Sequence, residues 1–502
     1  MNNLTRRSFL ASAAVLAPAP RRPNILFCIS DDQSWIHAGA YGSKFVRTPA
    51  FDRIGREGVL FTHAFVSTPS CAPSRASVLT GQDFYRLRET SMNHTEWWKP
   101  LAGYPDLLAQ HGYRTGFTGK GWAPGDFRAA GRKFNPCGPA FNGRLLKPPA
   151  EGIAGIDYAA NFEDFLQQRP AGAPFCFWAG FSEPHRVFPE GIGVKTGKRL
   201  ADVEVPAFLP DSPEVRGDLA DYAFEIEWFD GHLGRMLAAL EKAGELNNTI
   251  VVATSDNGMA FPRAKGNLYE YGVHMPLAIR WGGAKGGRVV EDFVSFTDFA
   301  PTFLEAAGAE ALPAATGRSL LPLLVASGSG RIDPVRDHAV FGIERHFPGS
   351  RPQGAGYPSR AIRTADYLYI RNLTPDRNPV GDHPGAVWPA DDPTGGFGDT
   401  DGGPSKTYLW QRRADHPELA RLAFGKRPAE ELYSASDPAN LKNLAGRPEH
   451  EAARRSLAAR LEARLVKTAD PRFTGQGSIL DGVMRRFPSL SAAVSSQQEG
   501  RK

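Results

Sequence analysis

The chain has 502 residues, 41% hydrophobic and 23% charged, a composition typical of a soluble globular protein with a large core. Its formal charge of +5 is small beside 59 basic residues, and no run of Lys and Arg indicates a partner nucleic acid. Of the four cysteines, Cys28 and Cys176 lie in apolar runs and are predicted core residues. A disulfide bridge between Cys137 and Cys176 is an alternative that the sequence leaves undecided.

The first 20 residues are predicted to form a targeting segment. Arg6 and Arg7 precede a short apolar run through Ala17, with small residues where cleavage would fall. The run is too short to span a membrane, so we expect no integral membrane segment in the mature protein. Twin arginines before a weakly hydrophobic run resemble a signal for the Tat export machinery, with an ordinary Sec signal as the alternative. Both predict export to a bacterial periplasm or out of the cell.

Apolar runs alternate with helical patterns through the first two thirds of the chain. We predict strands at residues 24–30, 114–118, 175–181, 250–254 and 277–281. Helical spacing of apolar residues predicts a long helix at 218–243 and a shorter one at 297–307. This alternation is typical of an α/β fold with a large, mostly parallel sheet covered by helices.

The character of the sequence changes near residue 335. A linker at 331–336 precedes predicted strands at 338–343 and 367–371, and then a Gly/Pro/Asp-rich loop at 372–406, which is either functional or disordered. Residues 431–444 introduce a predicted helix at about 448–467. We therefore divide the chain into the targeting segment 1–20, an N-terminal domain 21–335, a smaller α+β subdomain 336–484 and a mobile tail 485–502.

Polar residues follow four of the predicted strands. Because the carboxyl ends of parallel strands meet at one edge of a sheet, we expect these residues to lie close together. They are Asp31, Asp32, Lys120, His185, Asp256 and Asn257. Two pairs among them, Asp31 with Asp32 and Asp256 with Asn257, offer side-chain oxygens. These oxygens suit a hard cation, with Ca²⁺ as the first choice and Mg²⁺ as the second. The alternative is that each pair caps a helix or tightens a turn.

The string Cys71-Ala72-Pro73-Ser74-Arg75 places a cysteine at a predicted helix start. Ser70 is the predicted N-cap, and Pro73 suits the first turn. Cys71 would then lie at the positive end of the helix with Arg75 one turn on, a setting that favours an anion. The alternative is a buried structural cysteine at a helix start.

This string resembles the signature of type I sulfatases, in which the cysteine is oxidised to formylglycine (3-oxoalanine). The resemblance implies that a formylglycine-generating or sulfatase-maturating enzyme converts Cys71. It also implies an alkaline-phosphatase-like sandwich whose C-terminal subdomain lines the pocket. By the same resemblance the metal ligands are Asp31, Asp32, the modified Cys71, Asp256 and Asn257, and the sulfate-binding or proton-carrying residues are Arg75, Lys120, His185 and Lys265.

The family's mechanism then implies that the formylglycine hydrate attacks sulfur and that Asp256 takes its proton. His185 would protonate the leaving group, and the sulfate hemiacetal would expel sulfate to restore the aldehyde. One residue departs from the pattern. Many sulfatases carry a histidine two residues after the lysine that Lys120 matches, whereas this chain has Trp122. Either His185 or another histidine, such as His94, assists hemiacetal breakdown, or that step is slower.

Residues 247–281 and 344–372 are most similar to the heparan N-sulfatase (sulfamidase) branch. This resemblance implies a sulfated carbohydrate substrate with N-sulfated glucosamine at its non-reducing end. Arg345, His346 and Arg360 are then the expected contacts for a carboxylate or second sulfate. Animal sulfamidases have arginine where this chain has Lys265, and lysine is commoner in O-sulfatases. The alternatives are an O-sulfatase or arylsulfatase, a phosphonate monoester or phosphodiester hydrolase, and an inactive glycan-binding homologue.

Overall fold

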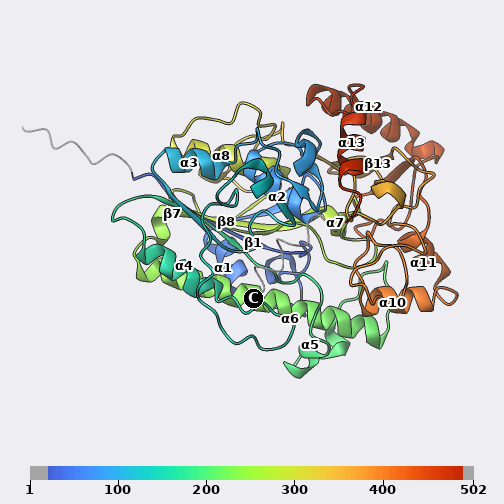
Figure 1. Ribbon diagram of the computed structural model, residues 1–502, viewed down its shortest axis with the longest axis horizontal. Helices are drawn as coiled ribbons and strands as arrows, with labels where there is room; N and C mark the ends of the chain where they lie inside the picture. Colours follow the sequence, from blue (N-terminus) through green and yellow to red (C-terminus); the bar gives the residue numbers. More distant parts are fainter. Residues whose placement is uncertain (1–20, 490–502) are drawn as a thin grey trace, which may run out of the picture.

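A large twisted sheet forms the centre of the computed structural model, which describes residues 21–489 (Figure 1). Its strands lie in the order β10-β2-β8-β7-β1-β6-β4, with β9 beside β2. All pairs are parallel except those of β8, which runs antiparallel to β7 and β2. The strands are β1 (Asn24–Ser30), β2 (Val59–Phe65), β4 (Arg114–Gly119), β6 (Phe175–Gly180), β7 (Thr249–Ser255), β8 (His274–Arg280), β9 (Arg288–Val290) and β10 (Val294–Ser295). The prediction of a large, mostly parallel sheet is confirmed.

Strand β1 is apolar along its length because both of its faces are buried. Ile25 and Phe27 pack in the core beneath α2, α3 and α8, whereas Leu26 and Cys28 pack in the core shared with α1, α4 and α6. Figure 1 shows these two sets of helices on opposite sides of the sheet. The helices are α1 (Pro49–Glu57), α2 (Cys71–Thr80), α3 (Tyr104–Gln110), α4 (Tyr158–Gln167), α6 (Pro213–Lys242) and α8 (Phe299–Ala307).

The long helix α6 begins earlier than residue 218, where the apolar pattern placed it. The Ser212 side chain accepts a hydrogen bond from the Val215 amide, and Pro213 occupies the first turn, where its missing N–H costs nothing. Shorter elements complete this part of the chain: β3 (Thr95–Glu96), β5 (Gly125–Asp126), α5 (Ile192–Lys195), α7 (Glu270–Val273) and α9 (Leu321–Val325).

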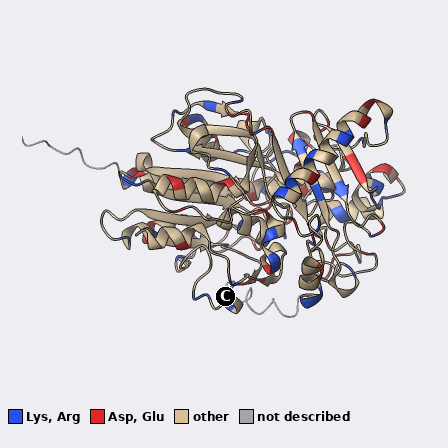
Figure 2. Ribbon diagram, turned by 90° about the horizontal axis from the view of Figure 1, so that it is seen from above, with Lys and Arg blue, Asp and Glu red and all other residues tan. Residues whose placement is uncertain are grey.

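A second, antiparallel sheet has the order β11-β12-β13-β14. One face packs against the first sheet, where the rings of Phe341 and Phe65 stack with centroids 5.8 Å apart. The other face packs Ile362 against Leu461 of α12. Arginines gather on this sheet (Figure 2), including Arg360 and Arg363 on β12. The elements are β11 (His338–Ile343), β12 (Ser359–Thr364), β13 (Tyr367–Asn372), β14 (Glu430–Ser434), α10 (Pro404–Gln411), α11 (Pro417–Phe424), α12 (Glu451–Lys467) and α13 (Ser478–Arg486).

The smaller C-terminal subdomain is thus confirmed, although the sequence pattern did not predict β12 as a strand. The expected boundary near residue 335 falls just before β11, and helix α13 runs past the expected start of the tail at 485. All four cysteines are free. Among residues 21–489 no helix combines the length and the apolar character needed to cross a bilayer. The predicted targeting segment lies outside the described residues.

Candidate active site

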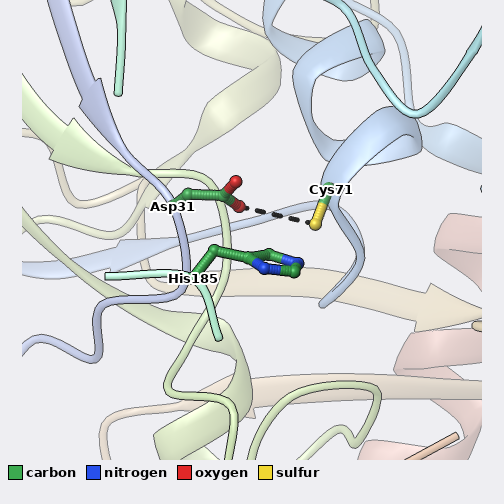
Figure 3. A group of neighbouring side chains, drawn as sticks. All are labelled: Asp31, Cys71 and His185. Atoms are coloured by element: carbon green, nitrogen blue, oxygen red, sulfur yellow. Dashed lines mark hydrogen bonds between the residues drawn. The ribbon is translucent and has the colours of Figure 1, made fainter. Parts of the chain in front are cut away.

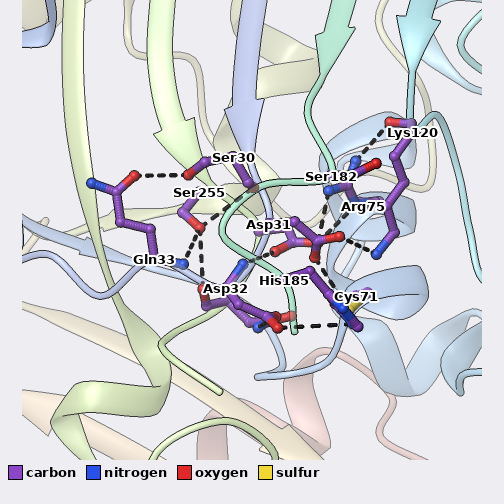
Figure 4. Close-up of polar contacts among 12 residues, drawn as sticks. Ser30, Asp31, Asp32, Gln33, Cys71, Arg75, Lys120, Ser182, His185 and Ser255 are labelled. Carbon is purple, nitrogen blue, oxygen red and sulfur yellow. Dashed lines mark hydrogen bonds and ion pairs between the residues drawn. The ribbon is translucent and has the colours of Figure 1, made fainter. Parts of the chain in front are cut away.

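The polar residues that follow the parallel strands meet at one edge of the sheet. Strands β1 and β7 are neighbours in register, with Ser30 opposite Ser255, so Asp31 and Asp256 follow side by side. Lys120 follows β4 and His185 follows β6, which pairs with β1 on its other side. Figure 4 shows this group of side chains converging with the start of α2.

Three carboxylates form the buried floor of the site. Asp31, Asp32 and Asp256 are at most 1% exposed, and each has an oxygen within 4.8 Å of the others. Burial raises the pKa of Asp32 to about 7, against the charge of Lys265, and that of Asp256 to about 6, against Arg75. Burial also opposes ionisation of Asp31, but Lys120 holds its pKa well below the usual range. The cations beside the floor therefore compensate its buried negative charge only in part.

Asn257 completes this floor. Its Nδ2 donates to Asp32 Oδ1 at 2.6 Å, whereas its Oδ1 is buried and accepts no hydrogen bond from the described residues. A buried amide oxygen without a partner is costly unless something absent from the protein chain satisfies it. Carboxylate and amide oxygens are the donors that hard divalent cations prefer. The four predicted metal ligands of the two pairs thus fit such a cation.

Cys71 lies at the start of helix α2, above the carboxylates. Its Sγ is 3.5 Å from Asp31 Oδ1, and the ring of His185 lies beside them (Figure 3). Burial raises the pKa of the Cys71 thiol well above its ordinary value. Ser70 occupies the N-cap position but does not cap the helix, because its Oγ contacts His346 Nδ1 at 2.9 Å instead. The predicted N-cap position is confirmed, and the Ser70 side chain connects the start of helix α2 to His346, which follows β11.

Arg75 is buried below the cysteine. Its Nε donates to Asp256 Oδ2 at 2.7 Å and its Nη1 to the carbonyl oxygen of Lys120 at 2.8 Å. The Lys120 ammonium in turn binds Asp31. Arg75 therefore fixes one carboxylate of the floor and the backbone of the lysine that pairs with another.

Lys265 crosses the site from the opposite side. Its Nζ lies 2.7 Å from Asp32 Oδ2 and 2.9 Å from Asp401 Oδ2. Asp401 belongs to the Gly/Pro/Asp-rich loop, and sequence reasoning missed it as a site residue. The only signal was the acidic composition of that loop, which does not say where the loop lies.

Trp122 stands at the position where the sulfatase pattern has a histidine, and two other histidines lie near the site. His185 Nδ1 lies 2.7 Å from the Arg186 carbonyl oxygen and its Nε2 lies 3.9 Å from Asp32 Oδ2. Burial and the charge of Lys265 lower the pKa of His185 to about 4. His94 is partly buried, and its ring packs edge-on against Phe347. Trp122 is buried against Trp97.

One of the three predicted substrate contacts is structural instead. Arg360 is fully buried and pairs with Glu344 at 2.7 Å and Asp470 at 2.5 Å, so the prediction that it meets substrate is corrected. Arg345 is 2% exposed, and its Nη1 donates to the carbonyl oxygens of Gly354 and Phe487. Its Nε and Nη2 have no hydrogen-bond partner among the described residues, so its predicted role stays a prediction. His346 reaches the site through Ser70.

Comparison with known proteins agrees with this arrangement. The sulfatase family profile matches residues 23–309, and the profile "N-sulphoglucosamine sulphohydrolase, C-terminal" matches residues 263–372. The chain is 32% identical to human N-sulphoglucosamine sulphohydrolase over 406 residues, 72% of this chain and 75% of that protein.

Two solved structures share the fold. One is a protein in complex with its substrate D-glucosamine-2-N,6-O-disulfate (TM-score 0.64, 20% identity, 90% of this chain and 99% of that one). The other is the phosphonate monoester hydrolase of Silicibacter pomeroyi (TM-score 0.65, 19% identity, 89% and 96%). At these identities the likeness concerns the fold alone, which is the expected alkaline-phosphatase-like one.

Proposed function

Since the chain belongs to the sulfatase family and is a hydrolase of sulfate esters or sulfamates, we propose that its substrate is N-sulfated glucosamine at the non-reducing end of a heparan-type glycan. The observation that carries this proposal is the second profile match, because residues 263–372 include β11, β12 and β13, three of the four strands of the second sheet. The similarity to the human N-sulphoglucosamine sulphohydrolase over most of the chain supports it.

We propose Ca²⁺, with Mg²⁺ second, among Asp31, Asp32, Asp256 and Asn257, with the residue at position 71 beside them. A divalent cation bound there would neutralise charge on the sulfuryl oxygens. The chain itself supplies further positive charge. Lys120 and Lys265 lie on two sides of the carboxylate floor, each paired with a different carboxylate, where they can bind the oxygens of a sulfuryl group.

We propose that Cys71 is the residue oxidised to formylglycine, which would supply the hydroxyl nucleophile. Its position supports this assignment. Helix α2 presents Cys71 above the metal-site carboxylates, with Arg75 fixing Asp256 from below. The buried, protonated thiol is by itself a poor nucleophile at neutral pH. We propose that Asp256 receives the proton that the nucleophile loses.

His185 is the proposed proton carrier for the leaving nitrogen. Because burial and Lys265 disfavour its charged form, we expect the ring to take up a proton only with the anionic sulfuryl group bound beside it. Because its Nδ1 faces the Arg186 carbonyl oxygen, the ring donates there and exchanges protons at Nε2. Nε2 faces the space between Asp32 and Asp401. Loss of a positioned acid typically costs about 10² to 10⁴ in rate. His185→Gln should therefore reduce kcat on the sulfamate far more than binding.

The test is turnover by purified protein whose position 71 has been characterised by mass spectrometry and whose metal content is known. We expect sulfate release from N-sulfoglucosamine and from heparin oligosaccharides that carry it at the non-reducing end. His185→Gln is the inactive control, and His416→Gln, on the far C-terminal part, is the matched control. Hydrolysis of only 6-O-sulfated or aryl substrates would indicate an O-sulfatase. Preference for a phosphonate monoester would indicate the other hydrolase class.

We further propose export by the Tat route, supported by Arg6 and Arg7 before the apolar run. Cell fractionation should find the wild-type protein outside the cytoplasm, and Arg6→Lys with Arg7→Lys should retain it inside. Export of that double variant at the wild-type level would indicate a Sec signal instead.

A further inference from the structure

Lys265 lies between two carboxylates of different origin. Asp32 belongs to the metal floor, whereas Asp401 comes from the loop between β13 and α10. Oxygens of Asp32 and Asp401 and a ring nitrogen of His185 all lie within 4.8 Å of one another. Asp401 therefore faces the space in which we place the reacting group.

The loop holds Asp401 in place from both sides. On one side Asp399 accepts hydrogen bonds from the Phe347 amide and the Ser350 hydroxyl and pairs with Arg351, all at 2.8 Å. The buried Lys406 ammonium also donates to the Thr400 carbonyl oxygen at 2.8 Å. On the other side the Gly402 amide donates to the Trp388 carbonyl oxygen at 2.8 Å. The negative charge of Asp401 is thus held at a fixed position in the site.

This fixed charge sets the electrostatic balance of the site. The site has four carboxylates and three cations, so its formal charge is −1. The carboxylates are Asp31, Asp32, Asp256 and Asp401, and the cations are Arg75, Lys120 and Lys265. A divalent cation brings the total to +1, which one singly charged substrate group neutralises. Without Asp401 the total would be +2, which matches a doubly charged group.

We propose that Asp401 is a specificity-determining residue that matches the site to a singly charged sulfuryl group and disfavours a doubly charged phosphoryl group. The inference rests on the proposed function, because it takes the sulfuryl group to bind beside Lys265. A sulfate ester or sulfamate has one negative charge. A phosphate monoester, with a second pKa of about 6, has close to two at neutral pH and above.

The experiment compares three aryl esters at about pH 8, where the phosphate monoester is a dianion. The probes are 4-nitrophenyl sulfate and 4-nitrophenyl phenylphosphonate, each singly charged, and 4-nitrophenyl phosphate. For Asp401→Asn we expect the kcat/KM ratio of phosphate to sulfate to rise about tenfold or more, the effect of one unit charge a few ångströms away in a partly screened site. The ratio of phosphonate to sulfate should stay unchanged, because those two probes have the same charge.

Two variants separate charge from structure. Asp401→Glu keeps the charge and should restore the wild-type ratio, whereas Asp382→Asn, in the same loop, should leave all three rates unchanged. Calorimetry supplies a second readout, without turnover and on metal-free protein. Asp401→Asn should gain more affinity for the sulfate dianion than for the sulfamate monoanion.

A proportional loss of all three activities, with unchanged anion preference, would overturn the inference and leave Asp401 a purely structural residue. Failure of the wild-type protein to hydrolyse any sulfate probe would instead count against the proposed function. The anion-affinity comparison tests the charge argument separately, since it needs no nucleophile. Equal gains for the two anions would refute it.

Discussion

Replacing Arg360 by methionine should destabilise the protein without a specific effect on substrate binding. The guanidinium is 0% exposed and donates to Glu344, to both oxygens of Asp470 and to the carbonyl oxygens of Ile343 and Ser359. A methionine side chain fills most of the space of the arginine, but it removes the positive charge that compensates the buried carboxylates of Glu344 and Asp470. Removing one partner of a buried ion pair typically costs about 3–5 kcal/mol.

The lower end of that range is expected here. Glu344 keeps Arg472 as a partner at 2.7 Å, and Asp470 keeps a hydrogen bond from the Arg472 amide at 2.8 Å. The uncompensated charge therefore falls mainly on Asp470. Adding Asp470→Asn to Arg360→Met should recover part of the loss, because it removes that buried charge. The two changes share one ion pair and should not be additive.

The assay is urea unfolding followed by circular dichroism, with KM for the glycan measured at low temperature on folded protein. Arg455→Met is the matched control, because it removes an exposed partner of Glu451 and should leave the unfolding midpoint unchanged. Wild-type stability for Arg360→Met together with a raised KM would refute the reasoning and restore Arg360 as a substrate contact.

Three further predictions concern chemistry and pH. Cys71→Ala should abolish turnover while leaving the unfolding midpoint close to wild type, and a fully active protein with only unmodified thiol at position 71 would contradict the assigned nucleophile. Asp256→Ala should weaken metal binding, measured by titration, and chelation should remove activity; full activity in metal-free protein, confirmed by elemental analysis, would exclude the metal site. Burial lowers the pKa of His37 to about 3 and of His232 to about 4, so at these two residues the unfolded chain binds protons first as pH falls below about 6.5, and their contribution to stability should decline from there toward pH 4. His232→Gln should make that decline shallower, and an unchanged slope in urea midpoints between pH 7 and pH 5 would show that His232 does not contribute.

The sequence by itself determined the features that depend on neighbouring residues. The apolar run at β1 predicted a strand with the bounds Asn24–Ser30, because a strand buried on both faces needs no polar alternation. The cysteine string predicted the start of helix α2 from its local pattern. The rule that parallel strands present their carboxyl ends at one edge predicted that Asp31 and Asp256 lie close together.

Only the tertiary structure decided which distant residues complete the site. Ser70 contacts His346 across 276 residues of sequence, and Lys265 meets Asp401 across 136. The sequence pattern does not distinguish a buried arginine from a substrate contact. For Arg360 the distinction comes from its ion pairs with Glu344 and Asp470, which are distant in the sequence. Local pattern records backbone preference and burial, whereas the pairing of charges depends on how the second sheet and its loop pack against the first.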